Sequence, residues 1–291
     1  MMKTSIFFVF VFFLIISCRK SPRDPLNCEY SSNFHNYFTI IHNDDAPSRP
    51  FHVFCKKVHV FGLYVYATDQ VSDEDLLHAA NILAQYLDND EDSIIDNPLV
   101  LEAMIARQAA MVLFKKPNSS KQRMFHNSED ESSKTYVVQD LYGEEIHPDW
   151  QKNVPFDATL EEVLHLITHC GFSQVYPSVF GEKKGTKIAD AMDKARGGYY
   201  EKVPAKYPID AWYTYDDQSC EYNCQVTEYF YWSLTSLLGA QDYPGRFDEI
   251  GQEWKAYSPT LLQTMDSDVY HILSDTSYVL PTVLPDGSYM R

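Results

Sequence analysis

The chain has 291 residues, 45% of them hydrophobic, and a formal net charge of −17. A chain of this length and apolar content can bury a full core, so we expect one large domain or two small ones and no disorder across most of it. The acidic excess argues against nucleic acid or anionic lipid as a partner and favours divalent cations.

Residues 1–18 have the layout of a secretory signal peptide. Lys3 precedes the apolar run SIFFVFVFFLIIS, which ends just before Cys18. This run is too short to cross a hydrocarbon core of ~30 Å as a helix, and no later segment is long and apolar enough to do so. We therefore predict a secreted protein. The alternative is a lipid anchor at Cys18, because IISC also resembles a bacterial lipoprotein cleavage box.

Five cysteines remain after such a cleavage, and most should pair in an oxidising compartment. Cys28 with Cys55 would tie the amino-terminal arm to the first strand. Cys220 with Cys224 would close a small loop, and the alternative is a bond from this pair to Cys170.

The pattern of the chain predicts an α-rich α+β fold, with a small amino-terminal β-sheet followed by a mostly helical body. Residues 19–50 are expected to form an irregular arm and residues 51–291 a single globular domain. FHVFCKKVHVFGLYVYAT alternates with a period of two, which predicts two strands with a bend at Gly62. Ser72 caps the helix that follows, and PLVLEAMIARQAAMVLF predicts a second helix beginning at Pro98.

Residues 115–134 are polar and serine-rich, which predicts a surface loop. If the domain divides into two parts, we expect the boundary in this loop. Asn118 opens NSS, the single glycosylation sequon of the chain. TYVVQDLYG predicts a further strand. Later helices are expected in TLEEVLHLITHCGF, TKIADAMDKARGG, the segment 221–238, RFDEIGQEWKAY and SPTLLQTMDSDVYHIL; the first of these should be capped by Thr159 and end at Gly171.

The segment DNDEDSIIDNP joins the first two predicted helices and resembles the EF-hand calcium loop. Asp88, Asp90, Asp92 and Asp96 occupy positions one, three, five and nine, and the carbonyl of Ile94 falls at position seven. Carboxylate oxygens that converge in this way are the ligands Ca²⁺ requires. The resemblance therefore implies a calcium site.

Two positions depart from the EF-hand pattern. Ser93 replaces the glycine of the sharp turn, and Leu99 stands where the family has a bidentate glutamate, although Glu102 lies one turn further on. The missing ligand implies weak binding, with a dissociation constant of ~10⁻⁴ to 10⁻³ M, as in extracellular modules. The alternative is an acidic, solvated turn.

The stretch TLEEVLHLITHCGF places His165 and His169 four residues apart, on one face of a helix, with Glu162 one turn earlier. Two neutral imidazoles at this spacing can bind one Zn²⁺. The pattern resembles the His-Glu-x-x-His helix of the zincin metallopeptidases. It departs from that helix at Leu166, where the family has the glutamate that takes a proton from zinc-bound water.

The zincin resemblance implies His165 and His169 as metal ligands. It implies a third ligand from a later helix, for which Glu228 is the candidate, and it leaves the role of the base to Glu162 or Glu161, unless Glu162 is itself a ligand. In the alternative interpretation both histidines pair with these glutamates and bind nothing.

These observations favour a secreted acidic protein with a calcium loop and a zincin-like site for Zn²⁺ or another divalent metal. As an enzyme it would be a metal-dependent hydrolase, with peptides as a substrate class. The alternative is a non-catalytic component of an extracellular or mineralised matrix, whose carboxylates collect calcium without chemistry.

Overall fold

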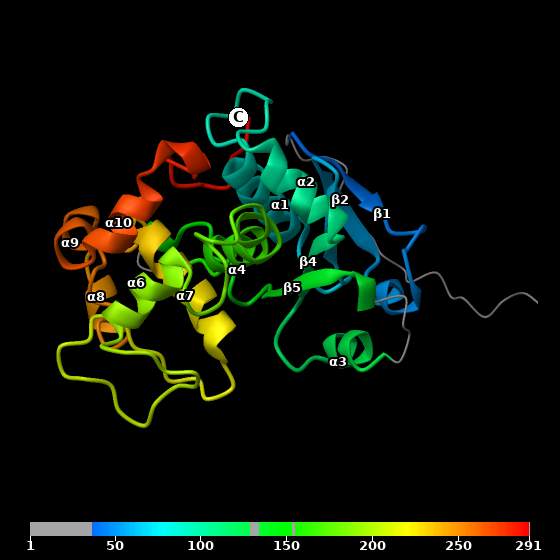
Figure 1. Cartoon of the computed structure of the whole chain (residues 1–291). Coiled ribbons are helices and arrows are strands. Elements are labelled where there is room, and N and C mark those ends of the chain that lie inside the picture. The colour runs from blue at the N-terminus through cyan, green and yellow to red at the C-terminus, as the bar shows by residue number, and fades with distance from the viewer. Residues whose placement is uncertain (1–36, 129–133, 153–154, 291) are drawn as a thin grey trace, which may run out of the picture.

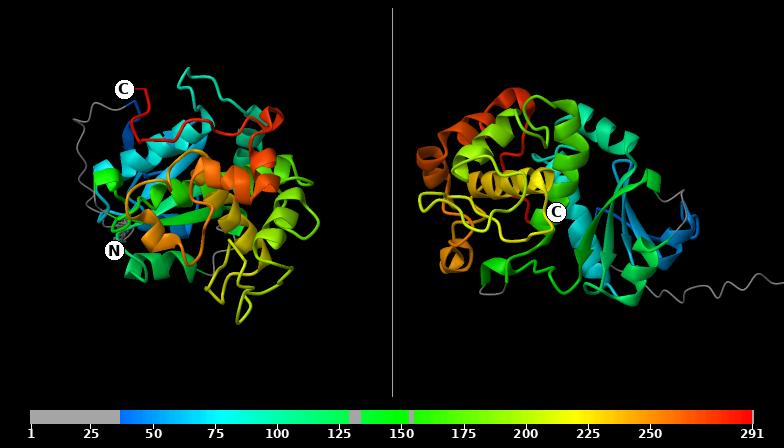
Figure 2. Two further views of the ribbon diagram at one scale, coloured as in Figure 1. Left: turned by 90° about the vertical axis from the view of Figure 1, so that its left-hand side faces the viewer. Right: turned by 60° about the horizontal axis from the view of Figure 1, so that its bottom comes forward.

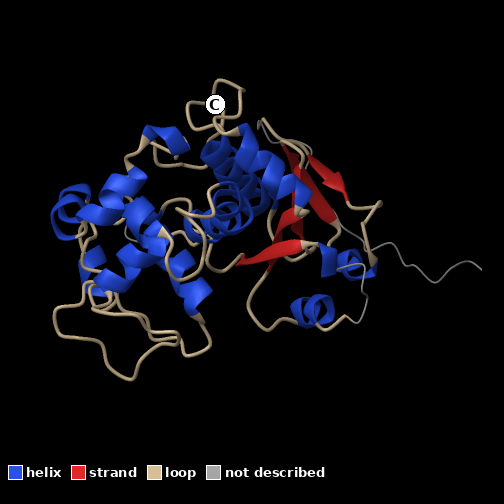
Figure 3. Cartoon of the chain, in the orientation of Figure 1, coloured by secondary structure: helices blue, strands red, loops and turns tan. Residues whose placement is uncertain are grey.

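The computed structural model describes residues 37–128, 134–152 and 155–290. The strands gather at one side of the molecule and most of the helices at the other (Figure 1, Figure 3). A five-stranded sheet is followed along the chain by a mostly helical body, so the expected helix-rich α+β fold is confirmed. The predicted signal peptide lies outside the described residues.

The sheet has the strand order β1-β2-β3-β4-β5. The strands β1, β2 and β3 pair antiparallel, whereas β3, β4 and β5 pair parallel, so β5 forms one edge. Their bounds are β1 (Ile40–His42), β2 (Lys56–Val60), β3 (Leu63–Ala67), β4 (Ala109–Phe114) and β5 (Val137–Tyr142). The strand β1 and the start of the short helix η1 fall in the segment 19–50, which the sequence predicted to be irregular.

The predicted hairpin around Gly62 is confirmed, and this glycine has a φ of +98°, in the left-handed region. The helix predicted from Pro98 is correct only for its first part. It ends at Ala106, Gln108 adopts a φ of +51°, and the apolar run AAMVLF then forms β4. All six residues of β4 are buried, because both faces of a central strand are covered, and such a strand carries no alternating pattern.

The helical elements follow the strands and partly alternate with them. Their bounds are η1 (Arg49–Val53), α1 (Asp73–Leu87), α2 (Pro98–Ala106), α3 (Ser120–His126), η3 (Trp150–Lys152), α4 (Thr159–Ile167), the π-helical η4 (Thr168–Phe172), α5 (Ser173–Val175), α6 (Lys187–Ala195), α7 (Tyr222–Leu237), α8 (Arg246–Ile250), α9 (Pro259–Met265), α10 (Ser267–Leu273) and η5 (Thr276–Tyr278). In the described part of the chain, none of them is long and apolar enough to cross a membrane.

The two faces of the sheet carry different layers. The helices α1 and α4 pack on one face, and with α7 they build the larger hydrophobic core. A smaller aromatic cluster on the other face joins the sheet to η1 and α3. Helices α6 to α10 lie on the far side of the α1–α4 layer from the sheet, as the right-hand view of Figure 2 also shows.

The ends of α4 differ from the prediction. Thr159 is not the cap; its own backbone N–H donates to Asp157 Oδ1 at 3.1 Å, and Ala158 is the N-cap residue. Gly171 does not end the helix, since the chain continues through η4 and α5. A Cβ at Gly171 would lie 2.5 Å from Val100 Cγ1, so the glycine allows close packing against α2.

The described residues of the predicted loop 115–134 contain a helix that was not predicted. Its first part contains α3, capped by the hydroxyl of Ser119, which accepts the backbone N–H of Gln122. The serine-rich composition therefore marked a helix cap as well as loop residues.

Among the cysteines, Cys220 and Cys224 are bonded to each other and Cys170 is buried and free. The small loop predicted for the first two is therefore confirmed. Cys55 is disulfide-bonded, and Cys28, its predicted partner, lies outside the described residues.

Candidate metal centre

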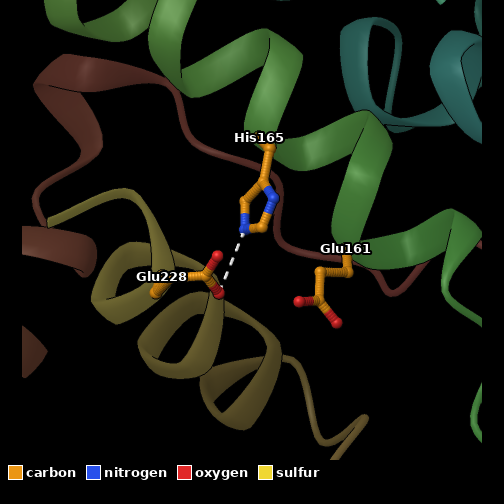
Figure 4. A group of neighbouring side chains, drawn as sticks. All are labelled: Glu161, His165 and Glu228. Atoms are coloured by element: carbon orange, nitrogen blue, oxygen red, sulfur yellow. Dashed lines mark ion pairs between the residues drawn. The ribbon is translucent and has the colours of Figure 1, made fainter. Parts of the chain in front are cut away.

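Three side chains from two helices converge beside the sheet edge. Glu161 and His165 stand one turn apart on α4, and Glu228 reaches them from α7 (Figure 4). One ligand atom from each of the three lies within 4.8 Å of the others. Two carboxylates and one imidazole are therefore positioned to share a cation.

His165 is 7% exposed and its ring is held edge-on to Tyr231. Its Nε2 is buried and has no hydrogen-bond partner among the described residues; the nearest carboxylate oxygen, Oε2 of Glu228, is 3.6 Å away. That distance is too long for a hydrogen bond. A buried polar atom without a hydrogen bond costs roughly 1–3 kcal/mol, and a ligand atom bound to this nitrogen would remove that cost.

The two carboxyl groups of the centre, Glu161 and Glu228, have raised pKa values. Burial raises the pKa of Glu161 to about 8, with a further increase from the neighbouring Glu228. Burial also raises the pKa of Glu228, against the lowering effect of His165. Burial alone would lower the pKa of His165, but the carboxylates around it outweigh that effect and raise it. A divalent cation bound among these groups would supply the positive charge that favours ionised carboxylates.

Two tyrosines support the carboxylates from outside the group. The hydroxyl groups of Tyr231 and Tyr215 act on Glu161 and Glu228, respectively, and each lowers the pKa of that carboxyl group. Such outer partners fix the orientation of metal-binding side chains.

Glu162 lies beside the three converging residues. Its Oε2 is 3.5 Å from Nδ1 of His165 and accepts a hydrogen bond of 2.5 Å from Gln139 on β5. Its side chain keeps 24% of its surface exposed, so the carboxylate is fixed but reachable.

His169, the second predicted ligand, lies apart from the centre. Its Nδ1 is 2.8 Å from Glu182 Oε2, and Thr227 donates to the other oxygen of Glu182 at 3.2 Å. His169 belongs to the π-helical η4, whose wider turn changes the direction it would have in an α-helix. The structure thus places Glu161, rather than His169, with His165 and Glu228.

The sequence reasoning missed Glu161 as a ligand, although a signal was present. Glu161 and His165 have the same spacing of four residues as His165 and His169, and Glu162 follows Glu161 directly. The segment Glu-Glu-x-x-His matches the zincin helix with its first histidine replaced by glutamate. In this register Glu162 stands where the family has its base.

A pocket of about 310 Å³ opens onto the centre from the sheet edge. It is bounded by β5, by α4 and η4, and by the start of α7. Its lining residues are Val137, Val138, Gln139, His165, Leu166, His169, Glu182, Asn223, Cys224, Thr227 and Glu228.

In the predicted calcium loop, carboxylate oxygens of Asp88, Asp90 and Asp92 lie within 4.8 Å of one another. Asp88 is fully buried and already accepts hydrogen bonds from the Tyr289 hydroxyl and a backbone N–H of the loop. Asp96 accepts the backbone N–H of Asn89 at 2.7 Å and lies outside the group of three.

Two further predicted residues are exposed. Ile94, whose carbonyl was predicted as a ligand, has a side chain that is 68% exposed. Asn118, the predicted glycosylation site, is exposed and precedes α3, and its backbone N–H donates to Gln122 at 2.6 Å.

No protein-family model, curated protein or solved structure matches this chain. The resemblances to zincins and to the EF-hand loop therefore stay predictions.

Proposed function

We propose that the chain is a metal-dependent hydrolase in which Glu161, His165 and Glu228 bind the metal and Glu162 is the general base. The observation that carries the proposal is the convergence of Glu161, His165 and Glu228 around the buried Nε2 of His165, which neither accepts nor donates a hydrogen bond within the described residues. Its ion-pair partner there is Glu228, with Oε2 3.6 Å away.

The ligand set favours a borderline divalent metal. Imidazole nitrogen suits Zn²⁺, and two carboxylates also suit Mn²⁺. Three protein ligands leave a position for water, as in catalytic zinc sites, and a metal so placed lowers the pKa of bound water toward 7.

Glu162 is suited to the role of base because it lies next to the ligands without joining them. Gln139, which lines the pocket, donates a hydrogen bond to one of its oxygens, and 24% of the Glu162 side chain is exposed. A base in hydrogen-bond reach of a metal-bound water needs this combination of restraint and access.

The sheet edge favours an extended peptide as the substrate class. Within the described residues the strand β5 pairs with β4 alone, and its residues 137–139 line the pocket at the centre. An extended chain can add to such an edge through main-chain hydrogen bonds, which would bring a peptide bond beside the metal. The disulfide between Cys220 and Cys224 supports an oxidising compartment, in keeping with secretion.

The proposal is tested by metal titration of the full chain with Zn²⁺ and Mn²⁺, followed by a peptide-hydrolysis assay with the loaded protein. Binding that disappears in His165→Ala, with hydrolysis that depends on the metal, would support it. A folded protein that binds neither metal would contradict it.

The second candidate function is non-catalytic calcium binding in an extracellular matrix. The observation that favours it is the convergence of Asp88, Asp90 and Asp92. This function needs no chemistry at His165, so the two candidates differ in whether a transition metal binds at α4.

A further inference from the structure

A second pocket, of about 340 Å³, lies on the face of the sheet turned away from α1 and α4. We call it the Lys57 pocket. Its lining residues are Asp45, Pro47, Lys57, Gly62, Leu63, Tyr64, Tyr66, Ile105, Gln108, Ala109, Ala110 and Tyr136. It shares no residue with the pocket at the metal centre.

The sheet register explains why this face is hollow. Lys57 pairs with Tyr66, and Tyr64 pairs with Ala110, so these four side chains point to the same face. On the same face of β4, Val112 and Phe114 fill the space above the sheet. Ala110 has only a methyl group, and the hollow lies above it.

The charge in this pocket comes from one buried ammonium group. The side chain of Lys57 is 3% exposed, and its Nζ lies 4.7 Å from the ring centroid of Tyr64 and 5.8 Å from that of Tyr66. A buried ammonium needs an anion close by. Asp45, at 2.5 Å, is the acidic residue that lines this pocket.

The partner of Lys57 is held only at the surface. The Asp45 side chain is 77% exposed and lies on the irregular segment between β1 and η1. Because a buried ammonium without a counter-ion is costly, the exposed carboxylate can turn into water only when another anion takes its place beside Lys57. The ammonium, in contrast, cannot leave. The anion is thus the exchangeable half of the pair.

We propose that the Lys57 pocket binds a small aromatic carboxylate, whose carboxylate replaces that of Asp45 on Lys57 and whose ring packs against the tyrosines. The volume is at the small end of the range of roughly 300–1,000 Å³ for ligand sites, which limits the ligand to about one ring. The rings of Tyr64, Tyr66 and Tyr136 offer aromatic faces and edges for the packing. The proposal does not depend on the metal centre.

The test is calorimetric titration of the full chain with benzoate, with benzylamine as the probe of opposite charge. We expect benzoate to bind and benzylamine not to bind. Asp45→Asn should bind benzoate about fivefold more tightly, because the protein carboxylate that competes for Lys57 is removed; fivefold corresponds to about 1 kcal/mol. Asp44→Asn is the matched control, because it removes the same charge from an exposed neighbouring position.

A second variant tests the hollow itself. Ala110→Val adds two methyl groups in the space above β4 and should abolish benzoate binding while the circular dichroism spectrum stays native. Three results would overturn the proposal: no benzoate binding to the wild-type chain at millimolar concentrations, equal binding of benzylamine, or an Asp45→Asn protein that binds no more tightly than Asp44→Asn.

Discussion

His165 on α4 and Glu228 on α7 face each other as an ion pair, with Nε2 and Oε2 3.6 Å apart, which is too far for a hydrogen bond. A metal ion between the two atoms would accept both as ligands.

Removal of the proposed ligand Glu228 should greatly weaken metal binding. We expect Glu228→Gln to lower the affinity for Zn²⁺ by more than the roughly 10- to 100-fold that the loss of a residue contacting a ligand costs. The measurement is a competition titration with a chromogenic chelator. Glu249→Gln, which changes an exposed glutamate on α8, should titrate like the wild type.

One pair of variants distinguishes the two possible ligand pairs on this part of the chain, Glu161 with His165 or His165 with His169. Glu161→Ala should lose the metal, whereas His169→Ala should keep it, because His169 is bonded to Glu182. The same titration gives the answer. If His169→Ala lost the metal and Glu161→Ala kept it, the zinc ligands would be those expected from His165 and His169.

Glu162→Gln should separate binding from chemistry. The amide preserves the shape of the side chain and leaves the three ligands intact, so metal affinity should be unchanged. Loss of the base should lower the rate of peptide hydrolysis by about 10²- to 10⁴-fold. A variant that retains the full rate would remove Glu162 from its assigned role.

The pair of His78 on α1 and Asp157, just before α4, predicts an acid-sensitive contribution to stability. Burial would raise the pKa of Asp157, but the hydrogen bond with His78 Nε2, 2.6 Å long, and two backbone N–H donors outweigh it and lower the pKa below 3.8. A lowered pKa means that the stabilisation is complete above the unfolded-state pKa of about 3.9 and is lost as the pH falls through the folded value.

For this reason Asp157→Asn should lower the free energy of unfolding at pH 7 by about 3 kcal/mol and should flatten its fall below pH 4. Urea unfolding at pH 7 and pH 3 measures both effects. Asp149→Asn is the control, since Asp149 is 72% exposed and pairs with Lys152 at the surface. Equal acid sensitivity in the wild type and Asp157→Asn would contradict the assignment.

The calcium loop gives an independent prediction. The wild-type chain should bind Ca²⁺ with a dissociation constant of ~10⁻⁴ to 10⁻³ M, and Asp90→Asn with Asp92→Asn should remove the binding. Calorimetry detects it, with Asp248→Asn as the exposed control on α8. If the wild-type chain bound no Ca²⁺ at several millimolar, the loop would be an acidic, solvated turn and not a calcium site.

The sequence predicted the hairpin at Gly62 and the helices α1, α6 and α7 because each is specified by a local pattern, to which α1 and α6 add the side-chain caps Ser72 and Thr186. It assigned AAMVLF to a helix, because a strand that is buried on both faces has an uninterrupted apolar sequence, which periodicity cannot distinguish from a helix. Only pairing with β3 and β5, which are distant in the sequence, decides its conformation.

Some residues of the candidate site could likewise be predicted from the sequence, and one could not. His165, Glu162 and Glu228 could be named from the sequence, since a histidine beside glutamates on a helix and a lone glutamate in an apolar helix are local signals. The exchange of His169 for Glu161 was not predictable, because it depends on the π-helical turn after Ile167 and on the contact with Glu182.

The most direct test of the metal centre is elemental analysis of the purified full-length chain after incubation with Zn²⁺ and exhaustive dialysis. We expect about one zinc per chain, held by Glu161, His165 and Glu228, and none in His165→Ala. Wild-type protein that leaves dialysis folded and free of metal would contradict the central claim.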